Sequence, residues 1–600
     1  MPKKIVSAIN YTARDFETIK NSLVEYAKKY YPDTYKDFNE ASFGSLMLDT
    51  VAYVGDIMSF YLDYQANETF LDTALEYRNV VKLARQMGYK YQPTPTSSGE
   101  VAFYALIPAN SAGTAPDENY YPILKRNGGV VSDNQTKYIL TEDVDFANPS
   151  NEIVVAKTNS VTGAPTFYAV KAFGRVISGE MTSEYIDVGA YTKFRTVELT
   201  QGANVSEIIK VSDSSGQEYF EVDYLSQDVI YKEFTNPTID NRKFASKLIK
   251  PVIVPRRFVV NREPGTTELQ FGYGSESDLS SDTILDPTRV LLKQTGKQYT
   301  TDTSFDPYNF TTSDKFGVVP VNTTLEIVYR VNSAANSNAP PGAINSPTDI
   351  TLKFKNSFNL NSTTMTEIRG SLEVINEEPI LGNLNYNSSQ DIKTRALGSF
   401  YSQNRAVTAQ DYKTLVYSMD TKFGAIARCN VLLDQDSFKR NLNLYVIAKD
   451  FSGKLSSANI SIKENLKTWL NKYKMMSDTI DILDARVVNL GIDFSVITEE
   501  EANKGEVLQK CFNALREHFS IAPDIGEPLH IIGLYNVLNK VQGVVDTTSV
   551  NIFQKRGEEY SDVFFNVKQN LSSDSRYVII PKNVIYEIKY MNDDIRGTVK

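Results

Sequence analysis

One helix near the N-terminus constrains the fold of this chain more than any other feature. Between about Ser42 and Ala66, small residues and leucines recur at heptad spacing along one narrow seam. The seam consists of Ser45, Leu48, Ala52, Gly55, Ser59, Leu62 and Ala66. The other faces are also apolar, apart from one stripe of aspartates, Asp49, Asp56 and Asp63. Because a helix that is apolar nearly all round must be covered on most sides, this segment predicts a helical bundle.

The seam leaves two interpretations of that bundle open. Small seam residues allow helices to approach closely, and sustained heptads favour coiled-coil packing. The partner helices belong either to this chain or to another chain, and the sequence pattern agrees with both. The aspartate stripe is interpreted as a solvated edge, because carboxylates at heptad spacing are too dispersed to surround one cation.

Two further helices complete the N-terminal region. Thr12 and Asp15 have the spacing of a capping box, which predicts a helix that starts at Thr12 and ends before Pro32. A third helix ends at Gly88, a residue suited to the left-handed position after a helix. The segment 92–99 contains two prolines and small polar residues, which predicts a linker without a packed core and a domain boundary.

The rest of the chain changes character twice. From residue 100 to about 385, Thr, Ser, Asn, Gly and Val dominate, and short runs such as Glu100–Ile107 and Leu325–Val331 lie between turn clusters. This pattern predicts strands joined by long loops, among them 332–347. From about Asn387 helical and strand periodicities alternate, and Thr408 with Asp411 repeats the capping box. The expected fold is therefore a multidomain α+β chain.

Three regions are predicted. Residues 1–92 form the N-terminal helical bundle, residues 93–386 form a central, mainly β region of two subdomains with long loops, and residues 387–600 form small α/β-layer domains. A chain of 600 residues has room for several domains of this size.

Composition excludes several classes of protein. A formal net charge of -10 argues against a general binder of nucleic acid, which needs clustered Lys and Arg. Asp49 and Asp56 interrupt the most apolar stretch, so no membrane-spanning helix is expected. The start of the chain has no apolar core of a secretory signal, so folding is expected in the cytoplasm. The two cysteines, Cys429 and Cys511, are interpreted as buried core thiols.

No set of residues points to catalysis. The chain has two histidines, His518 and His530, without the spacing of a metal site, and no nucleophile or phosphate-loop motif is present. Acidic residues such as Glu142 and Asp143 are too common to indicate a glycosidase. We therefore expect no catalytic residues, no cofactor, no metal site and a non-enzymatic role.

Several motifs resemble one known family. Tyr11-Thr-Ala-Arg-Asp-Phe16 and Phe43-Gly-Ser-Leu-Met-Leu-Asp-Thr-Val-Ala-Tyr-Val-Gly-Asp56 resemble the N-terminal bundle of the inner baseplate wedge subunit of T-even-type contractile phages. Ser388-Ser-Gln-Asp-Ile-Lys-Thr-Arg-Ala396, Arg405-Ala-Val-Thr-x-x-Asp-Tyr412 and Ile525-Gly-Glu-Pro-Leu529 resemble the baseplate J-like family, which includes that subunit. The resemblance covers residues 10–90 and 385–555 and is weaker between them.

The resemblance implies a structural subunit that forms the inner ring of a baseplate in the virion tail, assembled in the host cytoplasm. Implied partners are a second copy through the C-terminal region, a wedge subunit bundled with the N-terminal helices, and a sheath-initiator-type subunit, without nucleic acid or membrane insertion. The subunit would relay the conformational change that triggers sheath contraction. The alternatives are another J-like component of a simpler contractile injection machine and a tail-associated glycan hydrolase.

Overall fold

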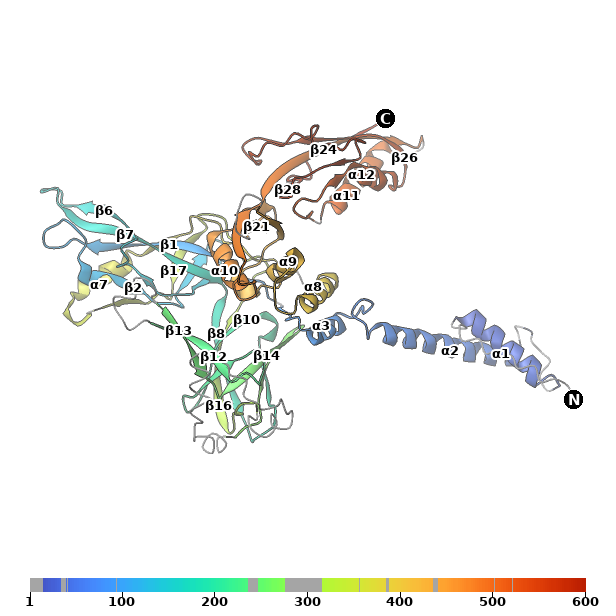
Figure 1. Cartoon of the computed structure of the whole chain (residues 1–600), viewed down its shortest axis with the longest axis horizontal. Helices are drawn as coiled ribbons and strands as arrows, with labels where there is room; N and C mark the ends of the chain where they lie inside the picture. The colour runs from blue at the N-terminus through green and yellow to red at the C-terminus, as the bar shows by residue number, and fades with distance from the viewer. Residues whose placement is uncertain are drawn as a thin grey trace. The chain divides into compact units, whose positions relative to one another are not determined.

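The structure is a computed structural model of the chain (Figure 1). It describes residues 15–33, 39, 42–92, 94–235, 247–275, 316–355, 357–384, 388–434, 441–500, 502–520 and 522–600. The chain divides into two compact units. Unit 1 contains Met1–Tyr91 and Asn387–Phe400, and unit 2 contains Gln92–Tyr386 and Tyr401–Lys600. Helices at the N-terminus, sheets in the middle and mixed elements after them confirm the predicted multidomain α+β class.

Unit 1 is helical in its described residues. Its elements are α1 (Phe16–Tyr30), α2 (Phe43–Asn67), α3 (Tyr77–Gln86) and most of α8 (Ser389–Ser402). As predicted, α2 begins after Ser42, whose hydroxyl accepts a hydrogen bond from Ser45 N. The predicted start of α1 is wrong in part: Asp15, expected inside the helix, is itself the N-cap and accepts from Thr18 N. Thr12 lies outside the described residues.

The third helix packs against α8 through a small apolar core. Val80, Val81 and Ala84 of α3 are buried together with Ile392 and Ala396 of α8. The hydroxyl groups of Tyr77 and Tyr91 lie 3.1 Å apart at the edge of this core. Residues 387–400, which were predicted with the C-terminal region, therefore belong to unit 1, and the three-region division of the chain stays a prediction.

Among the described residues, the first central sheet of unit 2 carries the largest apolar core. Its strands run in the order β17-β3-β4-β7-β1-β19, with β6 paired to β7, and a smaller sheet of order β18-β2-β5 lies in the same region. The core gathers residues such as Val101, Phe103 and Tyr138. The bounds are β1 (Ser98–Pro108), β2 (Pro122–Leu124), β3 (Gly129–Ser132), β4 (Lys137–Leu140), β5 (Val144–Asp145), β6 (Glu152–Thr158), β7 (Pro165–Ser178), β17 (Ile344–Thr348), β18 (Leu352–Phe354), β19 (Glu373–Ile375), α7 (Ser362–Gly370), η1 (Glu118–Tyr120) and η4 (Ser357–Asn359).

The second central sheet has a separate core. Its order is β8-β16-β10-β11-β14-β15-β9, and its core gathers residues such as Val205, Phe258 and Tyr329. The two ends of this strand order come close to each other: Glu184 on β8 accepts a hydrogen bond from Thr200 N, just after β9, at 3.3 Å. The bounds are β8 (Glu180–Val188), β9 (Thr196–Glu198), η2 (Gly202–Asn204), β10 (Val205–Asp213), β11 (Glu218–Glu221), β14 (Arg257–Glu263), β15 (Thr266–Phe271), β16 (Thr323–Val331) and a separate ribbon of β12 (Val229–Thr235) and β13 (Lys247–Ile253).

The remaining residues of unit 2 form two α/β layers. Helices α9 and α10 cover the sheet of β20, β21, β22 and β23. Helices α11 and α12 cover one face of the sheet of β24, β26, β28 and β29 (Figure 1). The predicted capping box is confirmed, with Thr408 and Asp411 bonded reciprocally. The bounds are α9 (Ala409–Tyr417), η5 (Thr421–Phe423), β20 (Arg428–Leu433), β21 (Asn441–Lys449), β22 (Leu455–Ser456), α10 (Ile460–Leu470), β23 (Thr479–Asp484), β24 (Arg486–Thr498), α11 (Lys504–His518), β25 (Leu529–His530), α12 (Ile531–Asn539), β26 (Val544–Gln554), β27 (Tyr577–Val578), β28 (Val584–Glu587) and β29 (Ile595–Val599).

The prediction that segment 92–99 lacks packed residues is wrong. Thr96 and Ser97 are both 0% exposed, and β1 already begins at Ser98. Small polar side chains can be buried when each donor and acceptor finds a partner, and this segment finds them in distant parts of unit 2.

Candidate functional site

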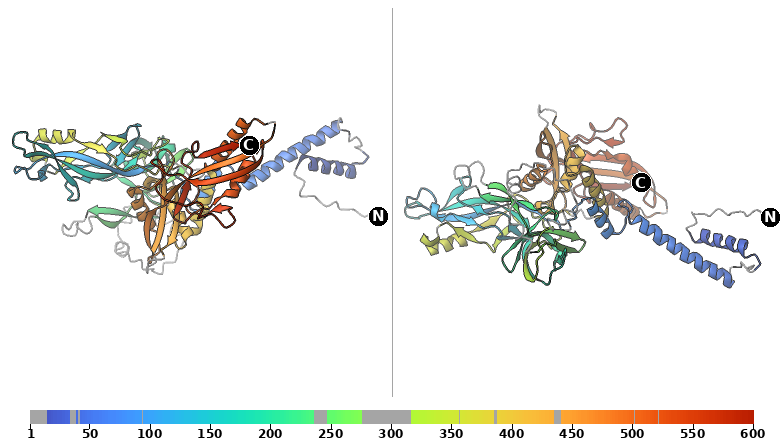
Figure 2. Two further views of the ribbon diagram at one scale, coloured as in Figure 1. Left: turned by 90° about the horizontal axis from the view of Figure 1, so that it is seen from above. Right: turned by 60° about the horizontal axis from the view of Figure 1, so that its bottom comes forward.

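Helix α1 covers one face of α2 within unit 1. A Cβ atom added to Gly55 would lie 3.3 Å from Ile19 Cδ1 of α1. Lys20 Nζ on α1 and Asp49 Oδ1 on α2 lie 2.7 Å apart, and Ala52 between them along α2 is fully buried. Figures 1 and 2 show α1 beside the N-terminal part of α2. Small side chains on α2 therefore permit this close approach.

The predicted seam divides into a covered part and an open part. Ser45 and Ala52 are buried, and Leu48, Gly55 and Ser59 are half-buried. Leu62 and Ala66, which continue the seam beyond α1, are exposed. Of the two interpretations of the seam, packing within the chain accounts for its first part. Among the described residues, none covers the second part of the seam.

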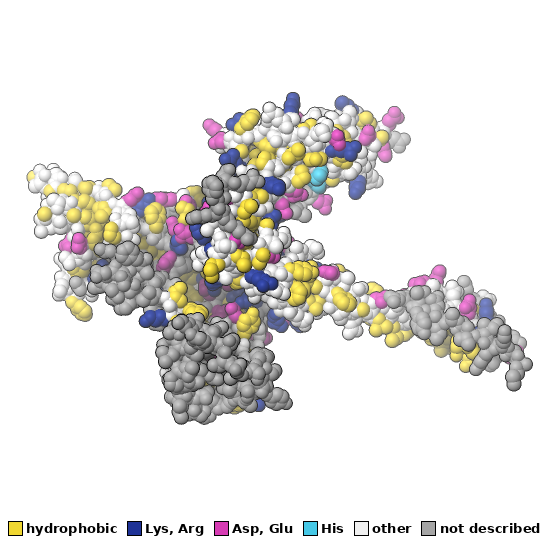
Figure 3. Space-filling view, in the orientation of Figure 1, with side chains coloured by type: hydrophobic (Ala, Val, Ile, Leu, Met, Phe, Trp, Pro, Cys, Tyr) yellow, Lys and Arg dark blue, Asp and Glu magenta, His cyan; other side chains and the backbone are white. Residues whose placement is uncertain are grey.

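Helix α2 exposes an unusual amount of apolar surface, most of it on the side opposite the seam. Phe60 and Tyr61, in the C-terminal third of α2, are 65% and 64% exposed. The other large apolar side chains exposed on α2 are Phe43, Leu46, Met47, Val51, Tyr53, Val54, Met58, Leu62 and Tyr64. Figure 3 shows hydrophobic side chains on the surface along α2. We name this exposed set the α2 face. Exposed apolar area of this extent is typical of a protein interaction site.

The turn between α2 and α3 is held by one carboxylate. Glu68, directly after α2, accepts hydrogen bonds from Leu75 N at 2.7 Å, Glu76 N at 3.2 Å and Asn79 Nδ2 at 2.8 Å. The Asn79 amide and then the Leu75 N–H lower the pKa of Glu68. Because Glu76 makes no side-chain cap on α3, the Glu68 carboxylate takes that place and offsets the positive end of the helix dipole.

The residues considered for chemistry are scattered. His518 ends α11 and His530 precedes α12, and both are exposed. Over the described ranges, no group of three or more His, Cys, Asp or Glu side chains is placed to hold a metal ion.

Cys429 and Cys511 are free and buried, as predicted, and burial raises the pKa of Cys429 to about 12. A search of the described helices finds none that is long and apolar enough to cross a membrane.

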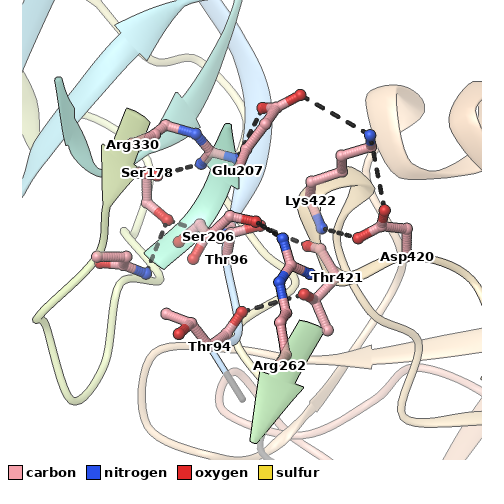
Figure 4. A network of polar contacts seen from close by, with 12 residues as sticks. Thr94, Thr96, Ser178, Ser206, Glu207, Arg262, Arg330, Asp420, Thr421 and Lys422 are labelled. Atoms are coloured by element: carbon pink, nitrogen blue, oxygen red, sulfur yellow. Dashed lines mark hydrogen bonds and ion pairs between the residues drawn. The ribbon is translucent and has the colours of Figure 1, made fainter. Parts of the chain in front are cut away.

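A network of polar side chains, which we name the polar joint, lies in unit 2 (Figure 4). Arg330 on β16 is 1% exposed and donates from Nη1 to Ser178 O at 2.6 Å. Its Nη2 lies 3.2 Å from Glu207 Oε2 on β10. Glu207 Oε1 in turn lies 3.8 Å from Lys422 Nζ of η5, and Lys422 Nζ lies 3.6 Å from Asp420 Oδ2. The joint thus connects the second central sheet with the α/β layers.

Segment 92–97 passes through this joint and bonds on both sides. Thr421 Oγ1 donates to Thr94 O at 3.0 Å, and Thr96 Oγ1 donates to Thr421 O. Asn332 Nδ2 donates to Pro95 O at 2.8 Å. Sequence reasoning missed the joint, because its residues are separated by up to several hundred positions and no local motif marks them. The signal available in the sequence was the run of small polar residues in the segment, which could have indicated buried hydrogen bonds.

Comparison with known proteins bears on the N-terminal segment. Residues 15–86 match the family model described as bacteriophage baseplate protein, N-terminal domain. A search of curated protein sequences found no match.

Among solved structures, the chain was matched to the cryo-EM structure of the anti-feeding prophage baseplate. That alignment covers 96% of this chain and 98% of the other, at 8% identity and a TM-score of 0.27. A score of this size carries no argument about the fold. Over residues 15–86 the chain is similar to the N-terminal domain of bacteriophage baseplate proteins, which supports a baseplate protein as its class.

Proposed function

We propose that this chain is a structural wedge subunit of a contractile-tail baseplate, one that forms the inner ring and acts without catalysis. The observation that carries the proposal is the α2 face, which lies inside the segment that matches baseplate N-terminal domains. An apolar helix face of this size is costly to leave in water, so a partner helix must cover it in the working particle. Helices of neighbouring wedge subunits are the partners that fit a heptad-spaced face.

The proposed role extends to the other parts of the chain. The C-terminal α/β layers make a contact with a second copy, a sheath-initiator-type subunit binds the assembled wedge, and the ring sits in the virion tail after assembly in the cytoplasm. Triggering changes the packing between subunits, which requires interfaces with two arrangements of similar free energy. This proposal follows from the motif resemblance and from the N-terminal match.

The test is capture of partner subunits by the full chain when it is co-expressed with contractile-tail proteins from the same source. Tyr61→Glu places a charge within the α2 face, and desolvating that carboxylate should abolish capture. Asn67→Glu is the matched control, since it adds the same charge on the same helix beside the aspartate stripe. We expect Asn67→Glu to keep capture.

Equal capture by both variants would rule out the α2 face as the wedge contact. Loss of capture by both would point to a general effect of added charge. A chain that captures no tail protein under any condition, and instead releases sugars from cell wall or capsule, would favour the glycan hydrolase.

A further inference from the structure

The two chain connections between residues 180–331 and the rest of unit 2 lie next to each other. The chain enters this segment at Gly179, between β7 and β8, and leaves it at Asn332, after β16. Glu180 and Val331 are paired across β8 and β16, so the entry and the exit lie next to each other. Gly179 has a φ of 128°, and a Cβ atom there would lie 2.8 Å from Val331 O. The two connections between this segment and the rest of unit 2 therefore lie side by side. One of them is a glycine in a backbone conformation that other residues avoid. This arrangement is typical of a hinge.

The apolar core of this segment is closed on itself. The buried cluster of the second central sheet draws its members from residues 188–331. The cluster of the first central sheet and that of the α9 layer contain only residues outside 180–331. Within the described ranges, no buried apolar cluster includes residues from both sides of the boundary. A rotation at the hinge therefore need not open a hydrophobic core.

Polar contacts hold the segment in place instead. Glu207 Oε1 faces Lys422 Nζ at 3.8 Å, Thr94 Oγ1 donates to Ala203 O at 3.4 Å, and Asn332 N donates to Asn204 O at 3.0 Å. Hydrogen-bonding groups of this kind exchange their partners for water when a joint opens, so opening costs far less than exposing apolar surface.

We propose that the described residues between 180 and 331 form a hinged subdomain that pivots at Gly179 and Asn332, and that the Glu207–Lys422 ion pair is the latch that holds it closed. The side chains of Glu207 and Lys422 are 35% and 30% exposed, so water and salt reach the latch and weaken it. The segment 92–97 enters unit 2 through the same joint, bonded to Thr421 beside Lys422. A displacement of that segment therefore acts directly on the latch. The hinge is a property of the chain and does not depend on the proposed baseplate role.

Ser206 offers a probe for opening. It lies on β10 next to Glu207 in the polar joint (Figure 4), and it is 3% exposed. Within the part of the chain that the structure describes, its hydroxyl has no hydrogen-bond partner. Ser206→Cys therefore keeps the size of the side chain without breaking a side-chain hydrogen bond. In the closed state the thiol is shielded, so its rate of alkylation under native conditions measures how often the joint opens. Peptide mass spectrometry separates this site from the buried Cys429 and Cys511.

The experiment compares alkylation of Ser206→Cys in the full chain with and without the latch. Lys422→Met removes the charge, and we expect alkylation to become about two- to five-fold faster, the change that loss of a partly exposed ion pair produces. Lys422→Arg keeps the charge and should keep the slow rate. Ala172→Cys, at a position in the core of the first central sheet that is 1% exposed, reports global unfolding and should not respond to Lys422→Met.

Two results would overturn the proposal. One is an unchanged Ser206→Cys rate in Lys422→Met, and the other is the same acceleration at Ala172→Cys, which would mean that only global unfolding opens the joint. If Lys422→Met fails to fold, sodium chloride replaces it: raising the salt to about 1 M shortens the screening length to about 3 Å. Salt should then accelerate alkylation at Ser206→Cys and leave Ala172→Cys unchanged, and equal rates at both sites would reject the latch.

Discussion

The carboxylate of Glu68 lies 2.7 Å from the backbone nitrogen of Leu75, so a side chain at the end of α2 caps the start of α3. The same carboxylate accepts from Glu76 N and from the Asn79 amide. These bonds fix the direction in which the chain leaves α2. Within unit 1, the helix that carries the α2 face is therefore joined firmly to the core that α3 forms with α8.

Replacing Glu68 by alanine should loosen this turn. The backbone N–H groups at the start of α3 would lose their acceptor, and their amides should exchange with solvent faster by hydrogen exchange mass spectrometry. Glu76→Gln is the matched control, because Glu76 makes no side-chain cap on α3. Unchanged protection of α3 in Glu68→Ala would show that the carboxylate does not hold the turn.

The same contact predicts a dependence on pH. Hydrogen bonds from Asn79 and then from Leu75 lower the pKa of Glu68 in the folded chain. A group with a lowered folded pKa stabilises the fold above its unfolded pKa, which is about 4.3 for glutamate. That contribution is lost as the pH falls through the folded value. Protection of α3 should therefore be constant from neutral pH to about pH 5 and decrease below about pH 4, a decrease that Glu68→Ala should lack.

Local signals predicted much of the fold, and the two predictions that were wrong have separate causes. Ser42 and Thr408 start helices where the sequence indicated, because a cap acts within four residues of itself. The start of α1 differed because Thr12 and Asp15 are both competent caps, and local pattern does not decide between them. Thr96 and Ser97 were misjudged because the groups that satisfy them, such as Thr421 and Ser178, are far away in sequence.

Ala52→Glu should detach α1 from α2 in the isolated chain. Ala52 is fully buried, and an uncompensated charge at such a position costs about 3 kcal/mol. Hydrogen exchange should accelerate throughout Phe16–Tyr30, whereas Ala52→Ser, which keeps a small side chain, should leave α1 protected. If α1 stays protected in Ala52→Glu, the α1–α2 packing described here is wrong.

The capping box at α9 gives a prediction for stability. Burial would raise the pKa of Asp411, but the N–H groups of Thr408 and Val407 outweigh that effect and lower it. Thr408→Ala removes one half of the box and should lower the free energy of unfolding by about 1 kcal/mol in chemical denaturation. Gln410→Ala, at an exposed position of the same helix, should change it by much less. Equal losses in the two variants would contradict a capping role.

The two histidines test the proposal that the chain is not an enzyme. His518 and His530 are both exposed, so changing both to asparagine should alter stability by less than about 0.5 kcal/mol. Assembly with tail proteins and infectivity of the particle should be kept. A double variant that assembles normally but loses a measurable hydrolytic activity would revive the hydrolase interpretation.

Among site residues, the sequence indicated the seam but not its division. Ser45 and Ala52 are covered by α1, whereas Leu62 and Ala66 lie beyond its reach. Heptad spacing shows which residues share a face of α2, but the length of the neighbouring helix decides how far that face is covered. The polar joint had no comparable signal, since Glu207, Arg330 and Lys422 meet only after three separate segments have folded.

Electron microscopy of the full chain co-expressed with contractile-tail proteins from the same source tests most directly whether the chain is a baseplate wedge subunit. We expect wedge- or ring-shaped particles that contain this chain, and we expect Tyr61→Glu but not Asn67→Glu to abolish them. A clean monomer under every condition of co-expression, with the α2 face still exposed to solvent in hydrogen exchange, would contradict a baseplate wedge subunit.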